Sequence, residues 1–131
     1  MGLLRIQVKD AIHMENVLQT HSSSGRLFVL FFGEGGWCPD CEEAHPHIEK
    51  ALAAVDKEGV ETVFAEVPLA RASYSVSANP DNANHWARVH PLFQLKKIPT
   101  LYRINKAGNK KIGELVEGDA AKDDLLEELL Q

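Results

Sequence analysis

Residues Leu27 to Cys41 read LFVLFFGEGGWCPDC, and this segment carries the strongest structural signal in the chain. Its first part, residues 27–32, is a continuous apolar run of strand length. The lack of alternation predicts a strand that is buried on both faces at the centre of a sheet. The glycine-rich residues 33–36 end this strand. A helix is expected from Pro39 onward, because proline is favoured in a first turn and acidic side chains there complement the helix dipole. The two cysteines therefore fall between a buried strand and the start of a helix.

This position gives Cys38 and Cys41 the geometry of a redox pair. Side chains three residues apart in the first turn of a helix lie on one side, about 5–6 Å apart. A disulfide needs Cα atoms roughly 4.4–6.8 Å apart, so the pair can form and break a bond with little backbone movement. The first thiol lies where the free backbone N–H groups of the helix start point, and these stabilise its thiolate. The pattern therefore predicts Cys38 as the attacking nucleophile and Cys41 as the resolving thiol.

Zinc binding and inert burial are the alternatives for this pair. Zinc sites use the same C-x-x-C spacing, and His45 lies four residues after Cys41 on the same helix face, with His47 close behind. However, Pro46 disrupts the geometry that would bring in His47, and a structural zinc ion needs four converging ligands. Two buried, inert thiols would rarely fall at a helix start beside tryptophan and glycine. The redox interpretation is favoured, because the cysteines follow a buried strand and open a helix.

Length and composition favour one domain in a reducing compartment. A chain of 131 residues can bury a core without disulfide staples, so we expect a single domain over residues 1–131. Only two cysteines are present, which favours a cytoplasmic location. The net charge of −5, with no basic cluster among aromatic residues, argues against nucleic acid as a partner. No apolar run has the length of a signal peptide or a membrane span, so we expect no membrane association.

The pattern outside the central segment predicts an α/β fold. Further strands are expected at residues 3–8, 60–67, 100–105 and 110–116. Two helices are expected to follow N-cap residues, Asp10 and Asp119. A third helix is expected from Pro39, with a kink at Pro46. A fourth is expected at residues 84–95, where Pro91 is unfavourable for the second half of the helix. The order strand, helix, strand is typical of a parallel crossover unit, and the last two strands form an antiparallel hairpin. Residues 68–83 have no sustained periodicity and are expected to form a surface insertion that narrows substrate choice rather than supporting the fold.

Beyond the cysteines, the chain resembles the thioredoxin superfamily over nearly its whole length. The resemblance rests on the motif Trp37-Cys38-Pro39-Asp40-Cys41, on Pro46 in the active-site helix, on Ile98-Pro99-Thr100, which looks like the cis-proline loop of that family, and on Gly108 in the closing hairpin. The W-C-P-D-C motif and the long segments 33–36 and 68–83 are especially similar to the thioredoxin domain-containing protein 17 branch. The resemblance implies a single thioredoxin-like domain with a central mixed β-sheet flanked by helices.

The resemblance also implies an activity. It implies a disulfide reductase that binds no cofactor, receives electrons from NADPH through thioredoxin reductase, and passes them to small molecules and selected proteins that contain disulfides. It implies a cis peptide bond before Pro99, which would place the backbone of Ile98 beside the disulfide to pair with an incoming peptide. Trp37 would cover the approach to Cys38 while also packing against the core.

One departure from the family concerns the proton acceptor for Cys41. Ordinary thioredoxins carry a buried aspartate in the strand before the motif, where this chain has only apolar residues at 29–32. The acceptor must therefore lie elsewhere. Glu66, on the expected neighbouring strand, and Asp40 in the motif are the candidates. The alternative for Glu66 is an ordinary solvated carboxylate at a strand end.

Several aromatic and histidine residues have less certain roles. The aromatic side chains Tyr74, Trp86 and Phe93 could line a substrate groove, although an aromatic residue in a helix more often belongs to the core. The histidines at positions 45, 85 and 90 are expected to be surface or packing residues.

Two other functions remain as alternatives. A glutaredoxin-like enzyme that uses glutathione also carries C-P-x-C, but the tryptophan before the motif and the lack of a Gly-Gly-Asp turn after Val116 argue against it. A thioredoxin-like module could instead hold a protein partner or zinc without turnover. Retention of both cysteines argues against that alternative.

Overall fold

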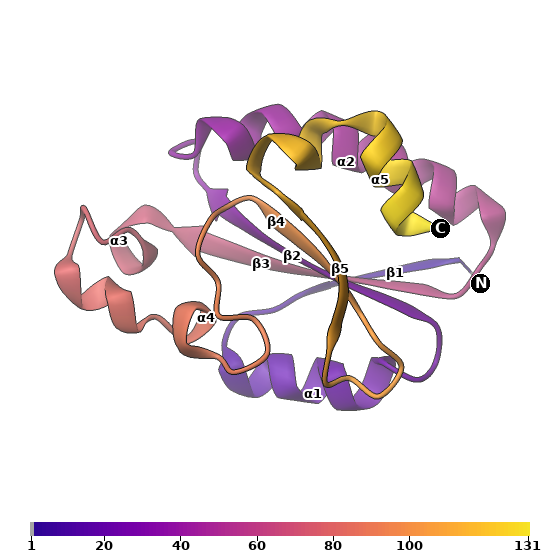
Figure 1. The fold of residues 1–131 in the computed structure, drawn as a ribbon, viewed down its shortest axis with the longest axis horizontal. Helices are drawn as coiled ribbons and strands as arrows, with labels where there is room; N and C mark the ends of the chain where they lie inside the picture. Colours follow the sequence, from indigo (N-terminus) through magenta and orange to yellow (C-terminus); the bar gives the residue numbers. More distant parts are fainter. Residues whose placement is uncertain (1) are drawn as a thin grey trace.

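The computed structural model describes residues 2–131, which form a five-stranded mixed sheet between two layers of helices (Figure 1). The strands are β1 (Leu3–Gln7), β2 (Arg26–Glu34), β3 (Thr62–Ala70), β4 (Thr100–Ile104) and β5 (Lys111–Val116). Their order in the sheet is β1-β3-β2-β4-β5. The strands β1, β3 and β2 run parallel; β4 pairs antiparallel with β2, and β5 pairs antiparallel with β4. The predicted α/β class with a mixed sheet is confirmed.

The helices divide between the two faces of the sheet. They are α1 (Ala11–His21), α2 (Pro39–Glu58), α3 (Arg71–Tyr74), α4 (Trp86–Val89) and α5 (Asp123–Leu130), with the 3-10 helices η1 (Pro80–Asn84) and η2 (Glu117–Ala121). Helix α1 covers one face, and α2 and α5 cover the other (Figure 1). No helix within residues 2–131 is long and apolar enough to cross a membrane.

Strand β2 supplies side chains to both layers of the core. Val29 and Phe31 pack in the cluster that contains Met14 of α1, whereas Phe28 and Leu30 pack in the cluster that contains Leu52 of α2. All four β2 side chains are buried. The uninterrupted apolar run therefore reflects a central strand that is covered on both sides, as predicted.

The starts of two helices, α1 and α2, are where the sequence predicts them. The Asp10 side chain accepts a hydrogen bond from the backbone N–H of His13 at 2.8 Å, so the predicted N-cap of α1 is confirmed. Helix α2 begins at Pro39 and continues through Pro46 to Glu58.

The prediction of a helix over residues 84–95 is wrong in extent. Only Trp86–Val89 is α-helical, and the chain then turns so that the N–H of Leu95 bonds to the carbonyl of Ala87 at 3.0 Å. His90 has an extended backbone with ψ 128°. The following proline explains this, because a residue before proline is pushed out of the helical region.

The expected N-cap at Asp119 is also wrong. Asp119 lies inside η2, and its side chain pairs with Lys122 Nζ at 2.9 Å instead of capping a helix. Helix α5 begins later, at Asp123, with no side-chain cap.

The segment expected as a surface insertion at residues 68–83 contains regular structure. Strand β3 extends through Pro68 to Ala70, and α3 and η1 follow. Strand β1 ends opposite Glu66, so the last residues of β3 pair only with β2 and a proline is tolerated on the free side. Tyr74 in α3 is 4% exposed and belongs to the core, so the segment does support the fold.

Candidate active site

Cys38 and Cys41 lie where β2 ends and α2 begins, and they are joined by a disulfide. Their Cα atoms are 5.2 Å apart, within the range that a disulfide requires. Each cysteine is 6% exposed. The fold thus brings the two sulfur atoms together and leaves only a small fraction of each cysteine exposed to solvent.

Each sulfur atom faces a backbone N–H group. Cys38 is the N-cap of α2, and its Sγ accepts from the N–H of Cys41 at 3.3 Å. The Sγ of Cys41 accepts from the N–H of Gly33 at 3.2 Å. Such donors favour negative charge on sulfur, because a thiolate accepts a stronger hydrogen bond than a thiol does.

Gly33 also makes room for the disulfide. A Cβ atom at this position would lie 2.7 Å from the Cβ of Cys38 and 2.9 Å from Cε2 of Trp37. Both distances are too short for carbon atoms, so only glycine fits beside the pair. The sequence identified this residue only as the end of a strand, since a close approach of the backbone leaves no local signal other than the glycine itself.

The side chain of Trp37 is hydrogen-bonded to the end of β3. Its Nε1 donates to the carbonyl of Leu69 at 3.0 Å, and its ring lies 6.4 Å from that of Tyr74, centroid to centroid. The side chain is half-buried and packs against the core. Trp37, the residue next to the nucleophile candidate, is therefore held by the end of β3 and by α3.

The loop before β4 approaches the disulfide from the other side. The peptide bond between Ile98 and Pro99 is cis, and the carbonyl oxygen of Ile98 lies 4.0 Å from Sγ of Cys38. The backbone of Ile98 is thus beside the disulfide, where the sequence resemblance placed it.

A cavity of about 310 Å³ is lined by Cys41. Glu66 and Pro99 also line it. The side chain of Glu66 is 19% exposed and accepts a hydrogen bond from Arg5 of β1. Asp40, by contrast, is an exposed residue on α2. Of the two carboxylates that the sequence suggested, Glu66 lines the cavity together with Cys41 and Asp40 does not; Glu34, Glu42 and Glu49 line it as well.

Arg5 links Glu66 to a second carboxylate. Its guanidinium donates to both oxygens of Glu49, at 2.8 and 2.7 Å, as well as to Glu66. These hydrogen bonds raise the pKa of Arg5, and the bond from Arg5 holds the pKa of Glu49 below its usual value. No local pattern predicts this network, because its members come from three separate elements, β1, α2 and β3.

The remaining aromatic candidates belong mainly to the core. Phe93 is fully buried, and Trp86 packs partly buried against the same cluster. The rings of Tyr74 and His85 meet edge to face at 5.4 Å. Burial, followed by the nearby charge of Arg88, lowers the pKa of His85.

His45 and His90 are the other two histidines that the sequence analysis considered. His90 is a packing residue: its side chain is 9% exposed, its ring lies 4.9 Å from that of Phe93, and it pairs with Glu15 at 2.6 Å. His45 is exposed. In the part of the chain that the structure describes, no group of three or more His, Cys, Asp or Glu side chains is arranged to hold a metal ion.

A mixed sheet of this order, with a C-x-x-C pair at the start of a helix and a cis-proline loop opposite, defines a thiol–disulfide oxidoreductase of the thioredoxin fold. Residues 7–131 match the family described as thioredoxin domain-containing protein 17-like, thioredoxin domain, and the chain belongs to that family. The family assignment suggested by the W-C-P-D-C motif is confirmed.

Solved thioredoxin structures share the fold. The reduced Schistosoma mansoni thioredoxin is 20% identical, with a TM-score of 0.56 over 98% of this chain and 99% of its own. The Fasciola hepatica thioredoxin is 19% identical, with a TM-score of 0.59 over 97% of this chain and 96% of its own. The Malassezia sympodialis thioredoxin is 17% identical, with a TM-score of 0.59 over 100% and 94%.

Two longer curated proteins also match. They are named acireductone dioxygenase, from Leishmania infantum at 31% identity and Leishmania major at 30% identity, each over 134 aligned residues and 95% of this chain. The chain spans 36% of the length of each of these relatives. The activity in their name is therefore not assigned to this chain.

Proposed function

We propose that this protein is a cytoplasmic disulfide reductase that receives electrons from NADPH through thioredoxin reductase and passes them to small or selected protein disulfides. The observation that carries the proposal is the Cys38–Cys41 pair, with a backbone N–H on each sulfur and the Ile98 carbonyl beside Cys38. The electron pair moves between sulfur atoms only, so no bound cofactor is needed.

The reaction proceeds in two exchanges. The thiolate of Cys38 attacks one sulfur of the substrate disulfide, the substrate S–S bond breaks, and the released sulfur takes up a proton. Cys41 then loses its proton and attacks Sγ of Cys38, which breaks the mixed disulfide and releases the second substrate thiol. The substrate has gained two electrons, and the protein is left with the disulfide described above.

Residues around the pair position the substrate. The carbonyl of Ile98 would accept a hydrogen bond from a substrate peptide lying along the loop that contains Pro99. Trp37 would exclude water from one side of Cys38, because its ring is held by Leu69 and Tyr74. Pro39 starts α2 without leaving an unpaired N–H beside the sulfur.

Glu66 is our proposed proton acceptor for Cys41. The two residues line one cavity of about 310 Å³, which is large enough for water molecules that carry the proton between them. Arg5 fixes the Glu66 carboxylate in that cavity. The exposed position of Asp40 makes it the weaker candidate.

Coupled NADPH oxidation tests the function. We expect thioredoxin reductase, this protein and a small disulfide to consume NADPH together, and no consumption above background with Cys38→Ser. Consumption only with glutathione and glutathione reductase would support the glutaredoxin-like alternative. No turnover with either reductant, for a protein whose two cysteines titrate as free thiols after reduction, would favour a binding module.

A further inference from the structure

Arg5 lies on the side of the sheet that faces α2. It is opposite Phe64 in the register of β1 and β3, and Phe64 belongs to the same buried cluster as Leu52 of α2. Glu66 is two residues further along β3, and side chains two positions apart in a strand point to the same face. The two strands therefore bring the Arg5 guanidinium and the Glu66 carboxylate into one layer, where they bond.

Helix α2 brings a second carboxylate to Arg5. Cys41, His45 and Glu49 follow one another at intervals of four residues, so they lie along one face of the helix. The guanidinium donates to both oxygens of Glu49, at 2.8 and 2.7 Å, and it also donates to Glu66. One cation thus binds two carboxylates that line the same cavity as Cys41.

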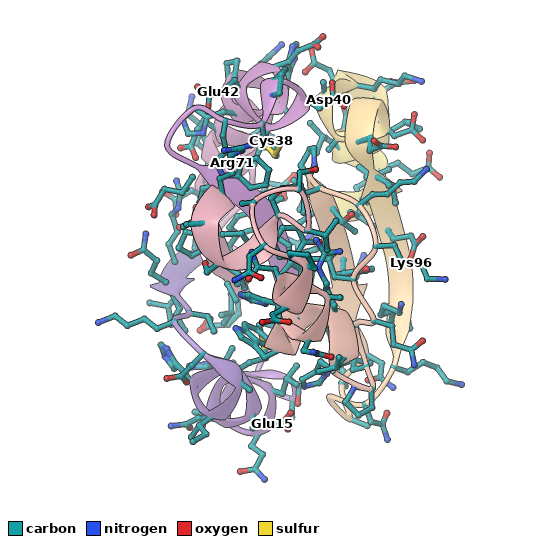
Figure 2. The ribbon with its side chains drawn as sticks, turned by 90° about the vertical axis from the view of Figure 1, so that its left-hand side faces the viewer. Glu15, Cys38, Asp40, Glu42, Arg71 and Lys96 are labelled. Carbon is teal, nitrogen blue, oxygen red and sulfur yellow. A yellow bond between two sulfur atoms is a disulfide. The ribbon has the colours of Figure 1, made fainter. Side chains whose placement is uncertain are left out.

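Carboxylates dominate the charged lining of that cavity. Its titratable residues besides Cys41 are four glutamates and a histidine, which come from β2, α2 and β3: Glu34, Glu42, His45, Glu49 and Glu66. Glu34 and Glu42 are exposed, so water and dissolved ions screen their charges. Figure 2 shows Glu42 at the end of the molecule that carries Cys38 and Asp40, which follows from their neighbouring positions at the start of α2.

Arg5 offsets the two charges that solvent screens least. The side chains of Glu66 and Glu49 are only 19% and 37% exposed. The bond from Arg5 holds the pKa of Glu49 below its usual value, so this carboxylate stays charged at neutral pH. Within residues 2–131, no lysine and no other arginine bonds to either carboxylate. Without Arg5, a thiolate at Cys41 would form beside two uncompensated negative charges, which disfavour it.

We propose that Arg5 is a positioning residue for the second exchange: by offsetting the charges of its two glutamate partners, it allows the Cys41 thiolate to form beside them. The inference rests on the proposed reductase function and adds a residue that acts on its resolving step. The chemistry is the exchange already described, in which Cys41 loses its proton and its sulfur attacks Sγ of Cys38. Arg5 bonds to Oε1 of Glu66, so the second carboxylate oxygen is left to take up that proton.

The pKa of Cys41 tests this inference directly. Cys38→Ser leaves Cys41 as the single thiol, and the pH dependence of its alkylation rate gives the pKa. In this background, Arg5→Gln should raise the Cys41 pKa by about 0.5–1 pH unit, because two partly buried charges lose their cation. Arg5→Lys keeps the charge but not the planar fork, so it should show less than half of that rise.

Paired variants separate a charge effect from a loss of structure. Adding Glu49→Gln to Arg5→Gln removes one of the freed charges, so the Cys41 pKa should fall back towards the parent value, whereas a damaged fold would not recover. Glu49→Gln alone should lower the Cys41 pKa, and it carries the test if Arg5→Gln does not fold.

Lys50→Gln is the matched control for the loss of a cation. Lys50 is the neighbour of Glu49 on α2, but it lines a different cavity and pairs with Asp123 at 3.4 Å. Because exposed charges act weakly, this variant should change the Cys41 pKa by less than about 0.2 pH units.

The rate of the second exchange should follow the same pattern. Dipyridyl disulfide is neutral and releases one coloured thione in each exchange, so one trace of a single turnover gives both rates. With both cysteines present at neutral pH, Arg5→Gln should slow the second release by about two- to fourfold and leave the first within about 1.5-fold. The effect is smaller than the change in pKa alone would give, because a more basic thiolate is also a better nucleophile.

Failure of this inference differs from failure of the proposed function. If reduced wild-type protein releases no second thione, the Cys38–Cys41 disulfide does not form and the reductase itself is refuted. If both thiones appear but Arg5→Gln leaves the Cys41 pKa within about 0.2 pH units, the role of Arg5 is overturned and the reductase remains. An equal rise with Lys50→Gln would also overturn it, since general charge would then explain the result. So would a Cys41 pKa that Glu49→Gln does not lower in either background.

Discussion

The two sulfur atoms of the disulfide have different surroundings. Cys38 lies beside the Ile98 carbonyl at the start of α2, whereas Cys41 adjoins the cavity lined by Glu66 and receives the N–H of Gly33. Both cysteines are almost equally covered by protein, so their accessibility does not separate them. The division of labour between them must therefore come from what each sulfur faces.

This difference predicts which variant traps a substrate. Cys41→Ser should accumulate a mixed disulfide between Cys38 and the substrate, because the second exchange is blocked. Cys38→Ser should accumulate almost none. Mass spectrometry of the two variants after incubation with cystine measures this, and the opposite pattern would reverse the proposed roles.

Glu66→Gln should slow the second exchange more than the first. The amide keeps a similar shape but cannot take the proton of Cys41, and loss of a general base typically costs about 100-fold or more. We expect release of the mixed disulfide to slow by at least about tenfold, with trapping by Cys38 unchanged. Glu49→Gln is the matched control, because Glu49 also binds Arg5 and lines the same cavity. A larger effect of Glu49→Gln, or of Asp40→Asn, would move the role to that residue.

Tyr102 should make the stability of the oxidised protein fall in strong alkali. Burial, together with the nearby charge of Glu114, raises the pKa of Tyr102 to about 12 from an ordinary value of 10.0. A raised pKa means that the folded protein favours the neutral phenol, so this stabilisation is complete below pH 10 and is lost as the pH rises towards 12.

The Tyr102→Phe variant isolates that effect. Phenylalanine does not ionise, so the variant should lose less stability than wild type between pH 10 and 12, by about 2 kcal/mol. Urea denaturation at a series of pH values measures the difference. Parallel curves for the two proteins would show that Tyr102 does not titrate in this range.

At the scale of elements, the sequence predicted the helices and strands that are determined by residues close together in the chain. The apolar run of β2 and the proline and acidic residues at the start of α2 lie within a few positions of one another. The cysteine pair was predictable for the same reason. In contrast, α3 and η1 have no periodic pattern, and contacts with distant parts of the chain hold them in place. Gly33, Arg5 and Leu69 were missed at the site because each reaches it through the tertiary fold.

Helix α3 therefore contributes stability through Tyr74. Its ring packs between Trp37 and His85, with the guanidinium of Arg88 lying 3.8 Å from the ring centroid. Tyr74→Ala should lower the free energy of unfolding by about 3–4 kcal/mol, as expected for removal of a buried aromatic ring. Chemical denaturation measures this loss. An effect below about 1 kcal/mol would mean that residues 68–83 are dispensable for the fold.

The hydroxyl of Tyr74 provides a contrasting variant. It is buried and has no hydrogen-bond partner among the described residues. Tyr74→Phe should therefore be at least as stable as wild type, because an unpaired buried hydroxyl is destabilising. A clear loss of stability would show that the hydroxyl has a partner in solution.

At the scale of the whole molecule, the side chain of Arg26 joins the last helix to the central strands. Arg26 at the start of β2 donates to the hydroxyl of Thr62 on β3 and to the carbonyls of Leu130 and Gln131 at the end of α5. These last carbonyls have no partner within the helix, and a cation there also complements the helix dipole. Arg26 thus ties the last helix to the central strands.

Arg26→Ala should destabilise the whole protein rather than only fray α5. Several hydrogen bonds from a charged, mostly buried group are lost at once, and we expect a decrease of about 2–4 kcal/mol in the free energy of unfolding. Lys57→Ala, which removes an exposed cation from α2, is the control and should change stability by less than about 0.5 kcal/mol. A loss confined to amide protection in α5 would show that the contact is only local.

The close fit around Gly33 bears on how sites of this kind are recognised in sequences and engineered into new proteins. Its N–H bonds to the sulfur of Cys41, eight residues later, and a Cβ atom there would collide with Cys38. A search pattern built from C-x-x-C alone leaves this position out, since glycine offers no reactive group to notice. Grafting the five residues W-C-P-D-C onto another strand and helix would transfer the thiols without the space and the donor that accompany them. A transplantable unit has to begin at residue 33, where the absence of a side chain is itself part of the site.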